Sequence, residues 1–343
     1  MKQILSAAFK VCILIALLWL LLYFGFIDFS ILGKILVRPE VLVLGVSAVF
    51  LSYLTGTLRW WLLLRSQKYR ISYFHALQLY AISIFSSTFV PGGTASSDAI
   101  RILMLMRIVP GRGGQAALAV FGDRFIAVLM LSVLAAVLTL TLRPFRTGAA
   151  DNPMFWLNIC ALLLPVSLII AAWVVRWITR LPKFRRKQDS REQNRLAHVM
   201  AVMADFFDLA LENKLNVVLA MLASLMTTAL SLGAIVICST VAAIPNLSSW
   251  EIAQAGALSM FANGLPLTPG GIGAGEIAFN EICFWIAGSK EHYPYATIFL
   301  AYSVICLIVS CYGAIALLNV RRLMTATAGQ QPGGGIQGSF PTR

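Results

Sequence analysis

Six long apolar runs constrain this chain more than any other feature of its sequence. Five of them are long enough to cross roughly 30 Å of hydrocarbon as a helix, and the first lies at the lower limit of length for a membrane span. Only 12% of the residues are charged and 59% are hydrophobic, whereas about one quarter of the residues of soluble domains are charged. We therefore predict an all-α polytopic membrane protein and do not expect a soluble enzyme. The predicted full spans are residues 11–27, 41–64, 116–142, 155–178, 215–243 and 294–318.

Two further apolar stretches, residues 73–106 and 250–287, are interrupted in the middle by Pro-Gly-Gly. Proline and paired glycines end helices, so neither stretch is expected to form one continuous span. Each is predicted to be a helical hairpin with its tip at the break. The residues of the two breaks are Pro91, Gly92 and Gly93 in the first, and Pro269, Gly270 and Gly271 in the second.

The distribution of Lys and Arg predicts the orientation of the spans. Basic residues in short loops mark the cytoplasmic side, and they follow spans 41–64, 155–178 and 294–318. Both termini are then cytoplasmic, hairpin 73–106 begins and ends inside, and hairpin 250–287 begins and ends outside. The two hairpins are thus predicted to be re-entrant from opposite faces. The densest basic segment, residues 176–195, is expected to lie against an anionic lipid surface.

The two breaks also align as a repeat. Pro269 lies 178 residues after Pro91, and an acidic residue, Asp98 or Glu276, follows each proline after seven positions. Because the orientation is reversed, the pattern predicts an inverted-topology repeat, which many secondary transporters share; chance Pro-Gly-Gly turns are the alternative. The chain is predicted to divide into a first membrane repeat over 1–180, a basic cytoplasmic loop with an amphipathic helix over 181–214, and a second membrane region over 215–323. This region is the rest of the second repeat, which begins with span 155–178. A disordered tail is predicted over 324–343.

The hairpin tips are the predicted functional site. Non-helical backbone at membrane depth is tolerated where it lines a cavity, and the free amides of a new helix attract anions. Glu276 is the leading candidate, because a buried carboxyl can carry a coupling proton or pair with an ammonium group. The alternatives are that the acids only cap helices, that Asp98 pairs with Arg101 along one helix, and that Arg59 reaches toward the headgroups. The remaining candidates are Ser96, Ser97, Arg124, Gly273 and Asn280.

Other chemistry has little support in the sequence. The six cysteines and three histidines have no metal-ligand spacing, and no cofactor is expected. No catalytic motif occurs, although transfer from a lipid donor by a single carboxylate stays open. The net charge of +13 is placed in loops beside spans, so no nucleic-acid partner is expected.

Several of these residues resemble one family. The run from Leu267 to Glu276, with Arg59 before two tryptophans and the pair Asp123 and Arg124, is similar to the flippase-like family typified by the transmembrane region of lysylphosphatidylglycerol synthase. The resemblance extends over about residues 9–323. It implies a bacterial inner-membrane protein that moves a membrane lipid between leaflets.

The chain departs from this family by lacking an aminoacyltransferase domain after the last span, so synthase activity is not expected and a separate lipid-synthesising enzyme is a potential partner. Two other functions stay open: a proton- or ion-coupled carrier of a small solute, and an accessory or lipid-modifying protein of envelope or glycolipid assembly.

Overall fold

The computed structural model describes residues 28–89, 94–109, 113–141, 153–180, 208, 212–242, 247–264, 273–288 and 293–318, and in these ranges every regular element is an α-helix. Five helical segments are long and apolar enough to cross a membrane. They correspond to five of the six predicted spans, and the sixth, residues 11–27, lies outside the described residues. The protein is therefore a multi-pass membrane protein. The five segments are α3 (Pro39–Ser66), α6 (Gly113–Thr141), α7 (Pro153–Arg180), α10 (Lys214–Ala242), and α13 (Ala296–Ser310) continued by α14 (Tyr312–Leu318).

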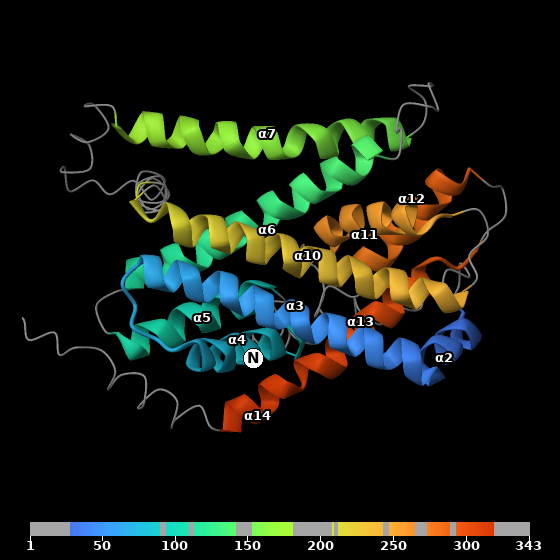
Figure 1. Ribbon diagram of the computed structural model, residues 1–343, viewed down its shortest axis with the longest axis horizontal. Coiled ribbons are helices and arrows are strands. Elements are labelled where there is room, and N and C mark those ends of the chain that lie inside the picture. Colours follow the sequence, from blue (N-terminus) through green and yellow to red (C-terminus); the bar gives the residue numbers. More distant parts are fainter. Residues whose placement is uncertain are drawn as a thin grey trace, which may run out of the picture.

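Helices α3 and α10 pack along each other at the centre of the molecule (Figure 1). The Thr55 and Thr227 hydroxyls lie 2.8 Å apart, and Arg59 Nη1 donates to Ser224 Oγ at 3.1 Å. From the first contact to the second, the residue number rises on α3, from 55 to 59, and falls on α10, from 227 to 224. The two helices are therefore antiparallel. Their carboxyl ends consequently lie at opposite ends of the molecule.

Two pairs of short helices follow those two ends. The first pair, α4 (Tyr73–Phe89) and α5 (Thr94–Ile108), comes after α3, and the second pair, α11 (Ser249–Asn263) and α12 (Ala274–Ala287), comes after α10. None of the four exceeds 17 residues, so each is shorter than about 30 Å. Figure 1 shows the pairs entering the bundle from opposite ends.

The inner ends of the two pairs meet. Thr94, at the start of α5, donates from its hydroxyl to the carbonyl of Gly264, just after α11, at 3.5 Å. Both Pro-Gly-Gly breaks themselves, residues 91–93 and 269–271, lie outside the described residues. Each stretch that the sequence divides at such a break thus forms two helices, and their inner ends lie together.

A short helix just before α3, α2 (Phe29–Val37), is fixed by its cap. The Asp28 carboxylate accepts from the Ser30 amide at 2.7 Å, and the Asp28 amide donates to Thr297 Oγ1 at 2.9 Å. This second bond joins the start of α2 to the start of α13. Side-chain capping therefore positions a loop helix against the last span.

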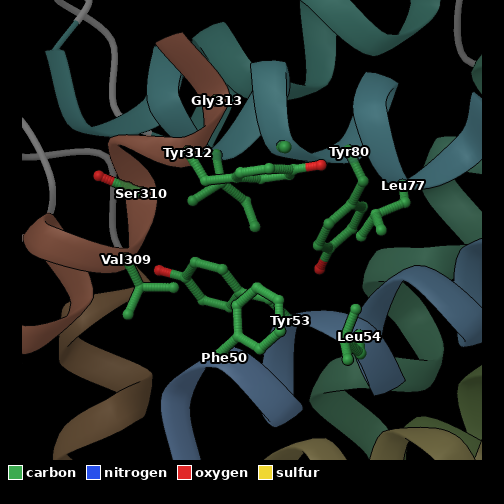
Figure 2. Close-up of a pocket in the computed structure, with 11 residues that line it drawn as sticks. Phe50, Tyr53, Leu54, Leu77, Tyr80, Val309, Ser310, Tyr312 and Gly313 are labelled. Carbon is green, nitrogen blue, oxygen red and sulfur yellow. The ribbon is translucent and has the colours of Figure 1, made fainter. Parts of the chain in front are cut away.

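The last predicted span, residues 294–318, is not one continuous helix. It is interrupted at Cys311, where α13 ends and α14 begins. After this break α14 packs against α4, and Figure 2 shows Tyr53, Tyr80 and Tyr312 gathered where α3, α4 and α14 meet. A cavity of about 10 Å³ lies among them. Gly313 makes the close approach possible, because a Cβ atom there would lie 2.2 Å from the Ala81 carbonyl oxygen.

We expect Gly313→Ala to destabilise the protein by about 1–3 kcal/mol, because the added methyl group would push α14 off the backbone of α4. The midpoint of thermal unfolding in detergent measures this effect. Gly233→Ala on α10 is the matched control, since a Cβ atom at that position meets nothing within 4 Å. Equal midpoints for the two variants would contradict the close packing of α14 on α4.

Candidate functional site

A cluster of charged side chains lies inside the helix bundle. Asp123 of α6, fully buried, accepts from Arg59 Nε of α3 at 2.6 Å and from Arg101 Nη1 of α5 at 2.7 Å. Both arginine side chains are also buried. One carboxylate therefore connects three helices, which suits a buried charge because it is paired on both sides.

Arg101 is further held by aromatic rings. Its guanidinium carbon lies 5.6 Å from the Trp60 ring centroid and 5.0 Å from that of Tyr80. Cation–π contacts of this kind stabilise a desolvated arginine. In the part of the chain that the structure describes, no hydrogen-bond partner reaches its buried Nε. The ring contacts and Asp123 thus fix this side chain in place.

Asp98 pairs mainly with a residue on another helix. It accepts from Arg124 of α6 through both oxygens, at 2.8–3.0 Å, whereas its distance to Arg101 is 3.5 Å. The predicted pairing of Asp98 with Arg101 is therefore the weaker contact. The cluster of Arg59, Arg101, Arg124, Asp98 and Asp123 holds three positive and two negative side chains, an excess of one positive charge.

A cavity of about 370 Å³ lies beside this cluster, between the inner ends of the helix pairs. Arg59 and Arg124 line it, and Arg124 keeps 39% of its side chain exposed. Hydroxyl groups of five helices line much of the rest, together with Asn263, whose side-chain oxygen is buried and has no hydrogen-bond partner among the described residues. The cavity thus combines polar and apolar side chains, and the partly exposed guanidinium of Arg124 faces it. Its hydroxyl-bearing residues are Tyr53, Ser87, Thr88, Thr94, Thr227, Thr228, Ser231, Tyr302 and Ser303.

Glu276 lies behind the cavity wall. It is fully buried, and one oxygen accepts from the Gly273 amide at 2.6 Å while the other accepts from Ser303 Oγ at 2.8 Å. The first bond caps α12, for which Gly273 adopts a φ of 106°, a conformation that favours glycine. The second bond joins Glu276 to a serine that lines the cavity. The partners of Asp98 and of Glu276, Arg124 and Ser303, therefore face the same space.

One family model matches this chain. The lysylphosphatidylglycerol synthase TM region matches residues 7–313. The chain belongs to this family. No curated protein and no solved structure matches it.

The remaining predicted site residues make contacts within the fold of this family member. Ser96 donates to the Ser86 carbonyl at 3.3 Å, and Ser97 accepts from Arg101 Nη2 at 3.5 Å. Asn280 accepts from the Ala296 amide at 3.3 Å, next to the start of α13. Three predicted features lie wholly or largely outside the described residues. Two of them are the tail 324–343 and the Pro-Gly-Gly breaks, which comprise Pro91, Gly92, Gly93, Pro269, Gly270 and Gly271. The third is the predicted amphipathic segment 181–214, of which only Asp208 and residues 212–214 are described.

Several residues of the site were not expected from the sequence. Ser224, Asn263 and Ser303 are polar residues of apolar helices, and no motif marks them. Asp123 does carry a signal, because an ionisable residue inside an apolar run is costly unless it is paired. Its role as the common partner of two arginines depends on how three helices pack.

We expect Asp123→Asn to destabilise the fold by about 3–5 kcal/mol, because two buried arginines would lose their shared counter-charge. The midpoint of thermal unfolding and the yield of monodisperse protein measure this loss. Asp208→Asn is the control: Asp208 pairs with Arg176 at 2.9 Å but keeps 47% of its side chain exposed, so about 1 kcal/mol or less is expected. A loss as small for Asp123→Asn would contradict the role of the cluster in the fold.

Proposed function

We propose that the protein moves a phospholipid or lipid-linked headgroup between leaflets, with the headgroup passing through the cavity between the helix pairs and the acyl chains staying in the bilayer. The observation that carries this proposal is Arg124, which faces the cavity of about 370 Å³ with 39% of its side chain exposed. Asp98 already pairs with this guanidinium, and a phosphate group could bind to the part of it that stays exposed, as a second source of negative charge and acceptor oxygens. Ala127, Val128 and Leu131 of α6 also line the cavity, and Val128 is 39% exposed. Apolar side chains that acyl chains could contact therefore adjoin the polar groups.

The family supports a lipid substrate over a soluble one. The family is named after lysylphosphatidylglycerol synthase, whose product is a phospholipid with an amine-bearing headgroup. A cavity that combines arginines with hydroxyl groups and opens beside apolar residues fits an amphipathic molecule. A small-solute carrier would need no such apolar side chains.

In this proposal the helix pairs are re-entrant hairpins, and the two halves of the chain form an inverted repeat. The packing supports it, because contacts in one half have counterparts in the other. The contact of α4 with α5 corresponds to that of α11 with α12, α3 with α4 to α10 with α11, α5 with α6 to α12 with α13, and α6 with α10 to α13 with α3. Two antiparallel central helices that each lead into a short pair are what such a repeat requires.

The proposed orientation in the bacterial inner membrane follows from the charges. The loop between α3 and α4 contains Lys68 and Arg70, and the segment after α7 is strongly basic, so these ends are assigned to the cytoplasm, together with both termini. The basic segment 176–195 then lies at the anionic cytoplasmic leaflet. A separate enzyme that synthesises the transported lipid would act from this side.

We expect Arg124→Gln to lower the rate of lipid transfer by about tenfold or more, since a charge-assisted contact contributes about 1.5–3 kcal/mol. In proteoliposomes, a membrane-impermeant quencher measures how fast headgroup-labelled lipids reach the outer leaflet. Arg107→Gln, an exposed residue at the end of α5, is the control and should transfer lipid at the wild-type rate. Absence of lipid transfer by the wild type, with uptake of a soluble solute instead, would replace this proposal by a solute carrier.

Glu276→Gln separates a role in capping from a role in transport. The amide is nearly isosteric, so its oxygen can still accept from the Gly273 amide, but its charge is lost. We expect a small change in the unfolding midpoint and a transfer rate at least about tenfold lower. Glu251→Gln is the matched control, because Glu251 caps α11 in the same way at the exposed end of the pair. Unchanged transfer by both variants would leave Glu276 with capping alone.

A further inference from the structure

Glu276 differs from the other acidic residues around the cavity. Asp98 and Asp123 pair with arginines, whereas no cationic side chain in the described part of the chain forms an ion pair with Glu276. Its two hydrogen bonds come from uncharged groups, the Gly273 amide and the Ser303 hydroxyl. A carboxylate that is buried without a cation is costly. The surroundings of Glu276 therefore suit a carboxyl group that binds a proton.

The helices packed against α12 bring no positive charge to Glu276. These helices are α11, α13 and the first half of α7, and Lys34 of α2, near the start of α13, is exposed. Among the described residues of these segments, the titratable side chains are carboxylic acids, thiols and a phenol. They are Glu251 of α11, Cys160 of α7, Tyr302 and Cys306 of α13, and Glu281 and Cys283 of α12 itself. The carboxyl group of Glu276 consequently has no fixed counter-charge there.

Ser303 connects Glu276 to the cavity. Its hydroxyl lies 2.8 Å from Glu276 Oε1, and the same residue lines the cavity of about 370 Å³. Glu276 itself is fully buried and does not line the cavity. An ammonium group in the cavity would have Ser303 between it and the carboxylate, whereas a hydroxyl group both donates and accepts a proton. The geometry thus favours a proton over any larger cation.

The transfer of this proton requires only the groups at hand and water. The cavity is large enough to hold water beside Ser303. A hydronium ion in this water gives its proton to Ser303 Oγ, while the hydroxyl proton of Ser303 moves to Glu276 Oε1. The serine keeps a hydroxyl group, the carboxylate becomes neutral, and release follows the reverse path. Both states keep the cap of α12, because Oε2 accepts from the Gly273 amide whether or not Oε1 carries a proton.

We propose that Glu276 is a proton-binding site, and that the proton binds together with the phosphate group of the transported lipid. The coupling rests on the proposed function, but the proton site itself does not. Ionised Glu276 places a negative charge behind the wall of the cavity to which Arg124 attracts a phosphate, and protonation removes this repulsion. By linkage, a bound phosphate favours the proton to the same extent. A lipid with one negative charge then crosses with one proton as a neutral pair.

Infrared spectroscopy tests the proton site without any transport. The full-length protein in detergent is titrated from acid to alkaline pH, and the C=O stretching band of protonated carboxyl groups is recorded. We expect a band that fades as the pH rises and that is lost in Glu276→Gln. In D₂O this band should shift more slowly in Ser303→Ala than in Ser303→Thr, which keeps the hydroxyl group. A band that is the same in the wild type and Glu276→Gln, or that does not change with pH, would overturn the proposal.

Glu281→Gln is the matched control for this measurement. Glu281 lies on the same helix, but it lines a different space, a mostly apolar lateral groove of about 560 Å³ between α7 and the second helix pair. It does not line the cavity. The variant should therefore keep the band that is assigned to Glu276.

A pH gradient across proteoliposomes tests the coupling. Phosphatidylglycerol with a fluorescent acyl chain is the probe, an impermeant quencher measures its distribution between leaflets, and protein-free vesicles give the background. We expect the lipid to accumulate in the leaflet on the alkaline side by up to about tenfold for each unit of pH difference, because one proton moves with each lipid. Glu276→Gln should abolish this accumulation.

The two measurements separate the two proposals. Transfer by the wild type without accumulation would overturn the coupling and leave the proposed function intact, as would accumulation that persists in Glu276→Gln. Absence of transfer, with the infrared band of Glu276 present, would overturn the proposed function and the coupling but not the proton site.

Discussion

Charges inside a bilayer are tolerated only when each has a partner, and in this protein that requirement connects the helices around the site. Asp123 holds Arg59 and Arg101 from two other helices, and both arginines are buried. Without this carboxylate, neither arginine would have its shortest ionic contact. The position of α5 relative to α3 and α6, and with it the wall of the cavity, therefore depends on one buried ionic junction.

The cluster as a whole keeps one more positive than negative charge. Arg59 and Arg101 share Asp123, whereas Arg124 pairs with Asp98 and keeps 39% of its side chain exposed. Arg59 and Arg124 line the cavity. In the proposed function, the fixed partners hold these arginines in place, and the phosphate group of a lipid would bind beside them in the cavity.

The second helix pair gives the protein two different surfaces. Through α11 it contributes Asn263 to the cavity, and through α11 and α12 it contributes the apolar wall and Glu281 to the lateral groove. Glu276 and Glu281 lie on the same short helix but have different surroundings. Glu276 is buried and caps α12, whereas Glu281 lines the groove and has no partner among the described residues. One layer of helices thus separates a cavity lined by charged and hydroxyl groups from a mostly apolar groove.

The sequence by itself determined the helical segments, because their signals are local: the length of an apolar run, a proline with paired glycines, and the residues that cap helices. Five of the predicted spans and both interrupted stretches were found in this way, as were Arg59, Asp98, Arg101, Arg124 and Glu276 as unusual residues in apolar surroundings. Which of these side chains meet was decided only by the tertiary structure. Asp98 pairs mainly with Arg124 and not with its helical neighbour Arg101, and Ser303 joins Glu276 to the cavity, because these contacts depend on the rotation and packing of separate helices. No spacing along one chain segment encodes that geometry.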